Sequence, residues 1–270
     1  MLTIVIPVKN EESNLLDCLN SIGKGFADKI VVIDSDSLDQ TKNIALNWGA
    51  ELLNFSWDGK FPKKRNWYLL NHAKNEDWIL FLDADERLTG EVKKEIRNNI
   101  QNKSIIGYWI PYTIYIEDKV LKFGYPLKKL ALFKIGSGLY EQVNEESWSH
   151  LDMEVHEHPI LKGETNKLKF KIEHRVNINT SNWKAKHLAY AKWEAKRFYD
   201  IKKIENAMDF TFSQKMKYLI LKTPFAGAIF FLGSTFVYLG ILDGINGFRY
   251  AMVKAQYFNS IRKEFNKIKN

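Results

Sequence analysis

The chain has a single cysteine, few prolines and no low-complexity stretch or internal repeat. Cys18 alone cannot form an internal disulfide or a cysteine-based metal site, and we expect it to be a small core residue because its neighbours favour a helix. No basic region followed by an apolar stretch precedes the strand-like residues 2–6. The sequence therefore predicts no signal peptide and a reducing, cytoplasmic setting.

Charge is spread unevenly along the 270 residues, which are 45% hydrophobic and 27% charged, a globular composition. Lys and Arg number 40 against 32 Asp and Glu, a net charge of +8. Residues 161–270 hold 21 basic and 8 acidic residues, a balance of +13, which leaves 19 and 24, a balance of −5, for residues 1–160. The basic part could face nucleic acid or an anionic membrane, and the apolar sequence near it favours the membrane.

The first hundred residues alternate strand-like and helix-like patterns. Apolar residues at helical spacing run from Leu15 to Ile22, and helices are also expected at 39–48 and 89–100. Strands are expected at residues 3–8, 29–33, 51–55 and 77–82. This alternation predicts an α/β fold with a largely parallel sheet and helices on both faces. Ligands of such sheets bind beyond the carboxyl ends of the strands.

The pattern changes in the second half of the chain. Residues 105–171 read as strands and loops, and residues 181–200 read as a helix. Its aromatic residues could stack on sugar rings, but their helical spacing favours a core stripe. Residues 223–242 carry no charge, and a helix of this length would reach about 30 Å, the thickness of a bilayer core, but Pro224 and three glycines interrupt it. Three interpretations stay open: a membrane-inserted or interfacial element, a buried helix at a subunit contact, and a true span.

Two carboxylates, Asp83 and Asp85, follow the apolar residues 78–82. A strand that ends in this way presents both carboxylates where the sheet opens to solvent. Hard oxygen ligands suit Mg²⁺ or Mn²⁺, which usually complete their shell with substrate phosphates. The alternative is a cap for the helix expected at 89–100, and we expect Glu86 to have that role.

Three ordered stretches make the chain resemble the family-2 glycosyltransferases with the GT-A fold: Ile-Pro-Val-Lys-Asn-Glu-Glu at 6–12, Val-Val-Ile-Asp-Ser-Asp-Ser-Leu-Asp-Gln-Thr at 31–41, and Leu-Asp-Ala-Asp-Glu at 82–86. Trp57 and residues 64–66, 155–158 and 242–244 are similar to the branch that builds lipopolysaccharide cores and exopolysaccharides. The resemblance covers most of the chain. It implies a GT-A catalytic domain over 1–205, with a nucleotide-binding half (1–100) and an acceptor and catalytic half (101–180), and a helical segment (206–270) that associates with a membrane or an oligomer.

The resemblance also implies the residues of the donor site. Asp34 and Asp36 would approach the base and ribose, because a carboxylate can accept hydrogen bonds from a ribose hydroxyl or a base N–H. Asp36 stands where the family often has glycine, and Asp tolerates a positive φ better than most residues. Arg65 would face the diphosphate or the base, or else be a solvated arginine at a helix start. The full expected donor set is Pro7, Asn10, Glu11, Asp34, Asp36, Arg65, Asp83 and Ala84.

The second half would supply the base and complete the metal shell. The resemblance places the acidic base at Glu157, with Glu154 and Asp152 as alternatives, while His156 and His158 would orient it or touch the acceptor. Mn²⁺ or Mg²⁺ would be held by Asp85 and His174, with Asp83 assisting, unless His174 is a core or surface histidine. The loop at residues 57–62 is expected to act as a lid beside the donor.

The expected function is an inverting, metal-dependent transfer of one sugar from a nucleotide-sugar to a lipid-linked, lipopolysaccharide or exopolysaccharide acceptor. The expected donor is a UDP-sugar. The enzyme would lie on the inner face of the cytoplasmic membrane, without nucleic acid, and could form a homo-oligomer. One alternative is a nucleotidyltransferase of sugar-nucleotide synthesis, which residues 9–12 disfavour because they lack a glycine-rich, phosphate-cradling loop. The other is a non-catalytic protein that binds nucleotide-sugar or anionic lipid.

Overall fold

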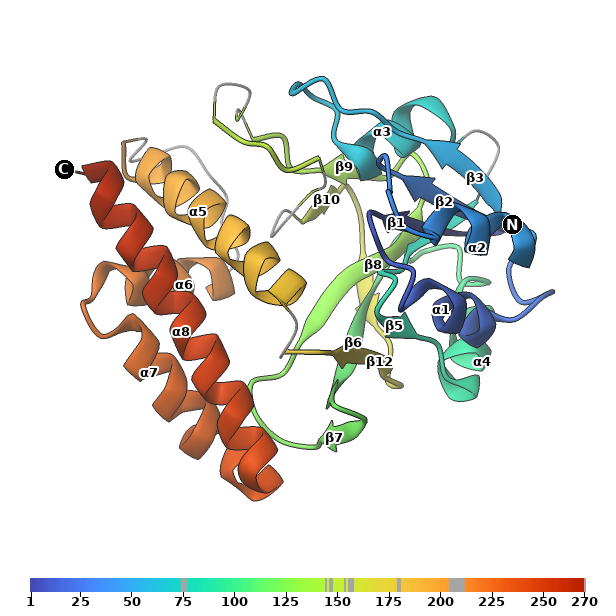
Figure 1. Ribbon diagram of the computed structural model, residues 1–270. Coiled ribbons are helices and arrows are strands. Elements are labelled where there is room, and N and C mark those ends of the chain that lie inside the picture. Colours follow the sequence, from blue (N-terminus) through green and yellow to red (C-terminus); the bar gives the residue numbers. More distant parts are fainter. Residues whose placement is uncertain are drawn as a thin grey trace. The chain divides into compact units, whose positions relative to one another are not determined.

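The computed structural model describes residues 1–73, 77–143, 145, 148–152, 154, 158–178, 181–203 and 212–269 (Figure 1). The chain divides into two compact units, residues 1–113 with 127–175 and residues 114–126 with 176–270. The expected boundary at 205/206 differs from this division, because the helix at residues 181–203 falls in the second unit with the C-terminal helices.

Four parallel strands form one half of the main sheet in the first unit. They stand in the order β3 (Glu51–Asn54), β2 (Lys29–Asp34), β1 (Leu2–Val8), β4 (Trp78–Phe81). The helices along this half are α1 (Leu15–Ile22), α2 (Thr41–Trp48), α3 (Lys64–Asn71) and α4 (Gly90–Asn99). The helix expected from residue 39 begins at Thr41, because the Thr41 N–H donates to the Asp39 side chain at 3.0 Å and holds Asp39 in a turn.

The other half of the sheet is mainly antiparallel, although residues 165–167 pair with residues 107–109 in parallel. β8 (Lys128–Lys134) pairs with β4, β6 (Gly107–Ile116) pairs with β8, and the order continues to β12 (Ile172–Val176) and β5 (Glu86–Arg87). β7 (Lys119–Leu121) and β11 (Thr165–Lys167) pair with β6, and β9 (Gly138–Tyr140) pairs with β10 (Pro159–Leu161) in a separate ribbon. The expected α/β class, with a mixed sheet flanked by helices and a C-terminal helical part, is confirmed.

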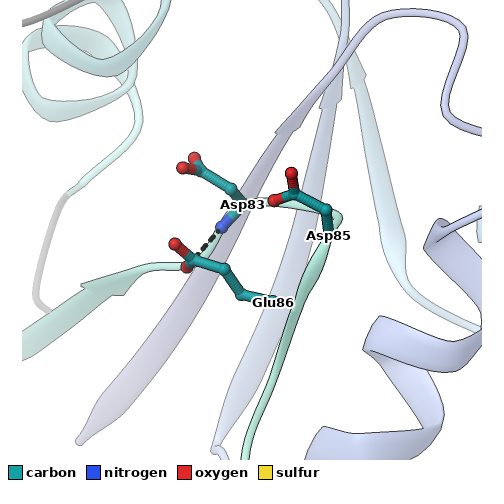
Figure 2. Close-up of side chains that lie close together, drawn as sticks. All are labelled: Asp83, Asp85 and Glu86. Atoms are coloured by element: carbon teal, nitrogen blue, oxygen red, sulfur yellow. Dashed lines mark hydrogen bonds between the residues drawn. The ribbon is translucent and has the colours of Figure 1, made fainter. Parts of the chain in front are cut away.

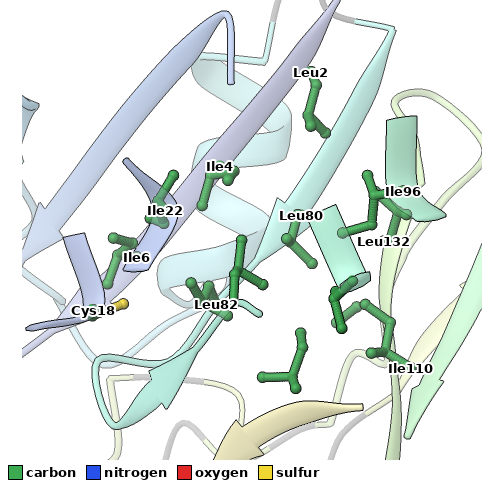
Figure 3. Close-up of a cluster of buried hydrophobic side chains, with 14 of the residues drawn as sticks. Leu2, Ile4, Ile6, Cys18, Ile22, Leu80, Leu82, Ile96, Ile110 and Leu132 are labelled. Carbon is green, nitrogen blue, oxygen red and sulfur yellow. The ribbon is translucent and has the colours of Figure 1, made fainter. Parts of the chain in front are cut away.

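Apolar residues of β1 alternate between two cores, which is why the sheet is covered on both faces. Ile4 and Ile6 pack with α1 and α4 on one face (Figure 3), whereas Val5 packs with Tyr68 of α3 on the other. Cys18 is fully buried in the first of these cores, so its expected role as a small core residue is confirmed. Each fully buried aliphatic side chain contributes roughly 1.5–3 kcal/mol, so this central strand fixes the position of the loop that follows it.

The second unit is helical. It contains α5 (Ser181–Lys203), α6 (Phe212–Lys222), α7 (Ala226–Leu232), a π-helical turn η1 (Gly233–Val237), a 3₁₀ turn η2 (Gly240–Asp243) and α8 (Gly244–Lys269). Ala195 and Phe198 of α5 pack against Ile261 and Phe265 of α8. Aromatic residues of α5 therefore include core positions, as the helical spacing indicated.

The uncharged stretch 223–242 is not one helix. It is divided among α7, η1 and η2, and Leu239 adopts a left-handed conformation with φ 57° between the two turns. In the described part of the chain no single helix has the length and apolar composition to cross a membrane. One bent pair, Ala226–Val237 with Gly240–Lys269, meets both requirements together, with a 76° angle between its two parts.

Candidate active site

Three carboxylates gather at the carboxyl end of β4 (Figure 2). Asp83 and Asp85 follow the strand and Glu86 opens β5, and one oxygen from each lies within 4.8 Å of the others. Since β4 is parallel to β1, and β1 to β2, the loops after these strands emerge at the same edge. The acidic cluster and the residues expected to bind the nucleotide therefore share one edge of the sheet.

Asp83 is bonded to two cations from distant parts of the sequence. Its Oδ1 accepts from the Arg65 guanidinium at 2.7 Å, and its Oδ2 accepts from Lys129 Nζ at 2.6 Å. Burial would raise the pKa of the Asp83 carboxyl, but Lys129 and Arg65 outweigh burial and hold this pKa well below its usual value. Asp83 is therefore a fixed negative charge between two cations.

Glu86 is a buried member of the cluster and does not cap a helix. Its Oε2 accepts the backbone N–H of Asp83 at 3.0 Å, and its Oε1 accepts from Lys129 at 2.5 Å. Burial raises the pKa of Glu86, Lys129 opposes that rise, and the charge of Asp83 adds to it. The expected capping role is wrong, because the Thr89 hydroxyl accepts from Val92 N at 3.3 Å and caps α4 in its place.

Asp85 points toward His174 of β12, as the pairing of β12 with β5 requires. The distance from His174 Nε2 to Asp85 Oδ2 is 3.2 Å, and the Arg175 N–H donates to the Asp85 carbonyl at 2.9 Å. Burial opposes ionisation of Asp85, but His174 lowers the pKa of this carboxyl below its ordinary value. Asp85 is also the most accessible carboxylate of the three, with 36% of its side chain exposed against 29% for Asp83 and 1% for Glu86.

The residues present fit a hard divalent cation. Three carboxylates provide oxygen ligands close together, and their charge exceeds that of Arg65 and Lys129 by one. Asp85 and His174, with Asp83 assisting, would hold the ion, as the resemblance implied. His is an acceptable ligand for Mn²⁺ and a poorer one for Mg²⁺, so a donor set that includes His174 would suit Mn²⁺ better than Mg²⁺.

Arg65 is held at the first turn of α3 by Glu154. The Glu154 carboxylate accepts the backbone N–H groups of Arg65 and Asn66, each at 2.9 Å, and the Glu154 carbonyl accepts from the Arg65 guanidinium at 2.7 Å. Burial would lower the pKa of Arg65, but Asp83 raises it, and the guanidinium stays charged. Arg65 is 8% exposed, so it is a buried partner of the acidic cluster and the alternative of a solvated arginine is wrong.

The loops after β1 and β2 are bonded to each other. The Asn10 N–H donates to the Ser37 hydroxyl and the Glu11 N–H to the Thr41 hydroxyl, both at 2.8 Å. Asp36 has φ 52°, so the left-handed conformation that glycine favours is present there, as the sequence suggested.

The remaining donor-set residues differ in how much side chain they expose. Asp34 is fully buried and bonds the Ser37 N–H at 3.0 Å, whereas Asp36 is exposed. Pro7 is buried inside β1, and Ala84 is buried and presents its carbonyl to Arg87 at 2.7 Å. Asn10 and Asp36 are therefore the exposed side chains of the set at this edge.

The loop at residues 57–62 lines a cavity of about 300 Å³. Its walls come from this loop, the start of α3, residues 141–143 and Glu145, and they include the buried ion pair between Lys63 and Glu145. The lining residues are Trp57, Gly59, Lys60, Phe61, Lys63, Asn66, Glu141, Gln142, Val143, Glu145 and Glu154. The expected lid is thus one wall of a cavity, and its movement stays a prediction.

The expected base, Glu157, lies outside the described residues, together with His156. Both alternatives to it lie within them and have structural partners. Glu154 is 4% exposed and bonded to the start of α3, and Asp152 Oδ2 lies 3.5 Å from Lys64 Nζ. These contacts disfavour Glu154 and Asp152 as bases, because a base needs a free oxygen near the acceptor.

Two cations of the site were not found from the sequence. Lys129 lies in β8, more than 40 residues beyond the acidic cluster, and reaches it because β8 pairs with β4. Lys64 is 1% exposed, and its Nζ donates to the Val8 carbonyl at 3.0 Å. Lys64 belongs to the stretch 64–66 noted above, but that stretch gave it no role. No local motif marks Lys129, although the alternating burial of a strand would place it on the face of β8 opposite to Lys128.

Comparison with known proteins supports the residues at this edge. The model of the family described as Glycosyl transferase family 2 matches residues 3–128. An uncharacterized glycosyltransferase of Rickettsia bellii is 40% identical over 91 residues, which are 34% of this chain and 30% of that protein. The 4,4'-diaponeurosporenoate glycosyltransferase of Staphylococcus haemolyticus is 32% identical over 95 residues, 33% of this chain and 25% of that protein.

Among solved structures, glucosyl-3-phosphoglycerate synthase of Mycobacterium tuberculosis, in complex with Mn²⁺, UDP and glucosyl-3-phosphoglycerate, is similar with 20% identity and a TM-score of 0.33, over 43% of this chain and 44% of that chain. The matched stretch thus spans 25–30% of the two curated relatives. The matched residues include the loops after β1 and β2, the acidic cluster and Arg65. Residues 3–128, just under half of the chain, are thus similar to glycosyl transferase family 2.

Proposed function

We propose that this chain is a divalent-metal-dependent glycosyltransferase that moves one sugar, with inversion, from a nucleoside diphosphate sugar to a lipid-linked or polysaccharide acceptor. The observation that carries the proposal is the cluster of Asp83, Asp85 and Glu86, which lies at the sheet edge where the loops after β1 and β2 also emerge. In a family 2 domain, that edge is suited to a nucleotide and its diphosphate. A UDP-sugar is the first donor to test.

The chain's own residues would bind and orient the donor. Asn10 and Asp36 are exposed on the two loops that face the nucleotide end of the edge. Arg65 and Lys129 place positive charge beside Asp83, where a diphosphate would lie near the cluster. Held by Asp85, His174 and Asp83, a divalent ion would offset the charge on the leaving diphosphate.

Transfer also needs a base for the acceptor. The acceptor oxygen forms a bond to the anomeric carbon as the bond from that carbon to the diphosphate breaks, and the acceptor proton passes to a carboxylate. Attack from the face opposite the leaving group inverts the anomeric configuration. We assign the carboxylate to Glu157, which the resemblance implied, and the structural occupation of Glu154 and Asp152 supports this choice.

An apolar acceptor would suit the second unit, which exposes large apolar side chains beside lysines. Together with the similarity of residues 64–66 and 242–244 to the lipopolysaccharide and exopolysaccharide branch, this favours a lipid-linked acceptor at the inner face of the cytoplasmic membrane. The acceptor's glycan and the linkage formed are to be identified by transfer assays.

A thermal-stability panel tests the donor and the metal. UDP-sugars, GDP-sugars and nucleoside triphosphates are each added to the protein with Mn²⁺ and with excess EDTA. A ligand at 100 times its Kd stabilises by about 2.7 kcal/mol, so the true donor should raise the Tm clearly, and only with Mn²⁺. Stabilisation by triphosphates alone would favour a nucleotidyltransferase, and stabilisation by no sugar nucleotide would overturn the proposal. Mn²⁺-dependent donor hydrolysis separates an enzyme from a non-catalytic binding protein.

A further inference from the structure

The second unit exposes a run of large apolar side chains between α7 and the start of α8. Phe225, Phe236, Val237, Leu242 and Ile245 are between 56% and 75% exposed. We call residues 225–248 the apolar tip. Scattered exposed apolar residues are ordinary, but a contiguous set of this kind marks a surface that is covered by something else.

A loop from the middle of the sequence is fastened to the apolar tip. The Asp243 carboxylate accepts the backbone N–H groups of Lys122 and Phe123 at 3.0 and 2.8 Å, and the Gly124 N–H donates to the Tyr238 carbonyl at 2.8 Å. Phe123 is 41% exposed and Tyr125 is 46% exposed, so this loop extends the same surface. Asp243, the one carboxylate within the apolar tip, thus has both oxygens hydrogen-bonded to backbone donors.

The apolar tip turns back on itself and does not continue in one direction. Its two helical parts meet at 76°. The backbone at the turn is bonded, since the Tyr238 N–H donates to the Gly233 carbonyl and the Leu242 N–H to the Leu239 carbonyl, both at 2.9 Å. A Cβ at Gly247 would lie 1.9 Å from the Gly240 carbonyl oxygen, so α8 can approach η2 this closely only with glycine there. These backbone bonds are made within the turn itself, which suits a segment entering a lipid interface.

The charges around the apolar tip are mainly basic. Lys119 and Lys122, in the segment bonded to the apolar tip, and Lys222, which ends α6, are exposed, as is the acidic Asp118. Glu117 is paired with Arg249 at 3.1 Å. Basic rims would repel each other across an interface between two copies, whereas an anionic lipid surface complements them.

We propose that the apolar tip, with the loop at 119–126, inserts into one leaflet of an anionic membrane as a re-entrant anchor. The exposed apolar residues would enter the boundary between headgroups and acyl chains, and the lysines would contact acidic headgroups. This inference stands on the second unit alone and does not depend on the reaction at the acidic cluster.

Flotation with lipid vesicles tests the anchor. The full chain is mixed with vesicles of phosphatidylcholine alone, or of equimolar phosphatidylcholine and phosphatidylglycerol. The wild type should float with the anionic vesicles, and the Val237→Asp/Leu242→Asp variant should bind them about tenfold more weakly or worse. Leu16→Asp/Leu46→Asp is the matched control: it adds the same two charges at exposed sites of α1 and α2, 47% and 57% exposed, and should float as the wild type does.

Three results would overturn the anchor. The first is a wild type that floats with neither kind of vesicle, and the second is a Val237→Asp/Leu242→Asp variant that binds the anionic vesicles as tightly as the wild type does. The third is a lipid-free wild type that is dimeric by light scattering, becomes monomeric with Val237→Asp/Leu242→Asp and does not bind vesicles, which would assign the surface to a second copy. Stabilisation of the Val237→Asp/Leu242→Asp variant by a sugar nucleotide is measured in parallel. This measurement distinguishes a loss of membrane binding from a loss of donor binding.

Discussion

Asp83 and Asp85 are two residues apart in the sequence, yet their surroundings give them different roles. The Asp83 carboxylate forms ion pairs with Arg65 and Lys129, and removing its charge would leave both cations partly unpaired. Asp85 instead contacts His174 and is the more exposed carboxylate. Asp83→Asn should therefore lower the free energy of unfolding by about 1–3 kcal/mol, while Asp85→Asn should change it by less than about 1 kcal/mol. Urea unfolding measures both. Equal losses would contradict the assignment of Asp83 as the structural charge of the cluster.

Glu157 is assigned the proton transfer, so its charge should matter for turnover and little for donor binding. Glu157→Gln keeps the size of the side chain and removes its basicity. Transfer should fall about 10²- to 10⁴-fold, with an unchanged donor Kd. Asp152→Asn is the comparison, because its carboxylate is engaged by Lys64. Near-normal turnover in Glu157→Gln would move the base to another residue.

The pair of Lys64 and Asp152 predicts a pH dependence of stability. Burial opposes ionisation of Asp152, but Lys64 lowers its pKa below the usual value of about 3.9. A carboxyl with a depressed folded-state pKa contributes its full stability above the unfolded-state pKa and loses it as the pH falls through the folded-state pKa. The difference in unfolding free energy between wild type and Asp152→Asn should be constant from about pH 7 to 5 and shrink below about pH 4. A difference that grows in acid would contradict the pairing.

At the scale of elements, the first turn of α3 is held by Glu154, which lies 89 residues after Arg65 and 88 residues after Asn66. Glu154 accepts the N–H groups of both Arg65 and Asn66. Glu154→Gln replaces one acceptor with an amide and should cost about 1–2 kcal/mol of unfolding free energy. Glu91→Gln, an exposed acid in the first turn of α4, should cost less than about 0.5 kcal/mol. If the two variants lose the same stability, Glu154 is not a cap.

Elements built from local signals were predictable and those built from distant pairings were not. The buried β1 and the periodic α1 followed from the spacing of apolar residues, because a strand and a helix repeat with different periods. The cap of α4 was assigned to Glu86 when Thr89 provides it, since several polar residues in a row could have done so. The break in residues 223–242 was signalled by Pro224 and the glycines, but its geometry depends on the fit of α8 against η2.

At the scale of the whole molecule, the acidic pair could be placed because it follows a strand, and parallel strands end at one edge. Lys129 could not be placed, because its contact with Asp83 depends on the antiparallel pairing of β8 with β4. Residues 114–126 likewise group with the C-terminal helices through contacts remote in sequence, which no local pattern indicates. Local chemistry thus points to the reaction class, and long-range pairing decides which cations complete the site.

The central claim is that a sugar nucleotide binds at the acidic cluster together with a divalent ion held by Asp85. Calorimetric titration of UDP into the wild type and Asp85→Asn, each with Mn²⁺ and with EDTA, tests this claim, and Asp17→Asn on α1 is an exposed-carboxylate control. The account predicts binding to wild type and Asp17→Asn only with Mn²⁺, and an affinity at least about tenfold weaker for Asp85→Asn. Equal affinity of wild type and Asp85→Asn for UDP, or equal binding with EDTA, would contradict it.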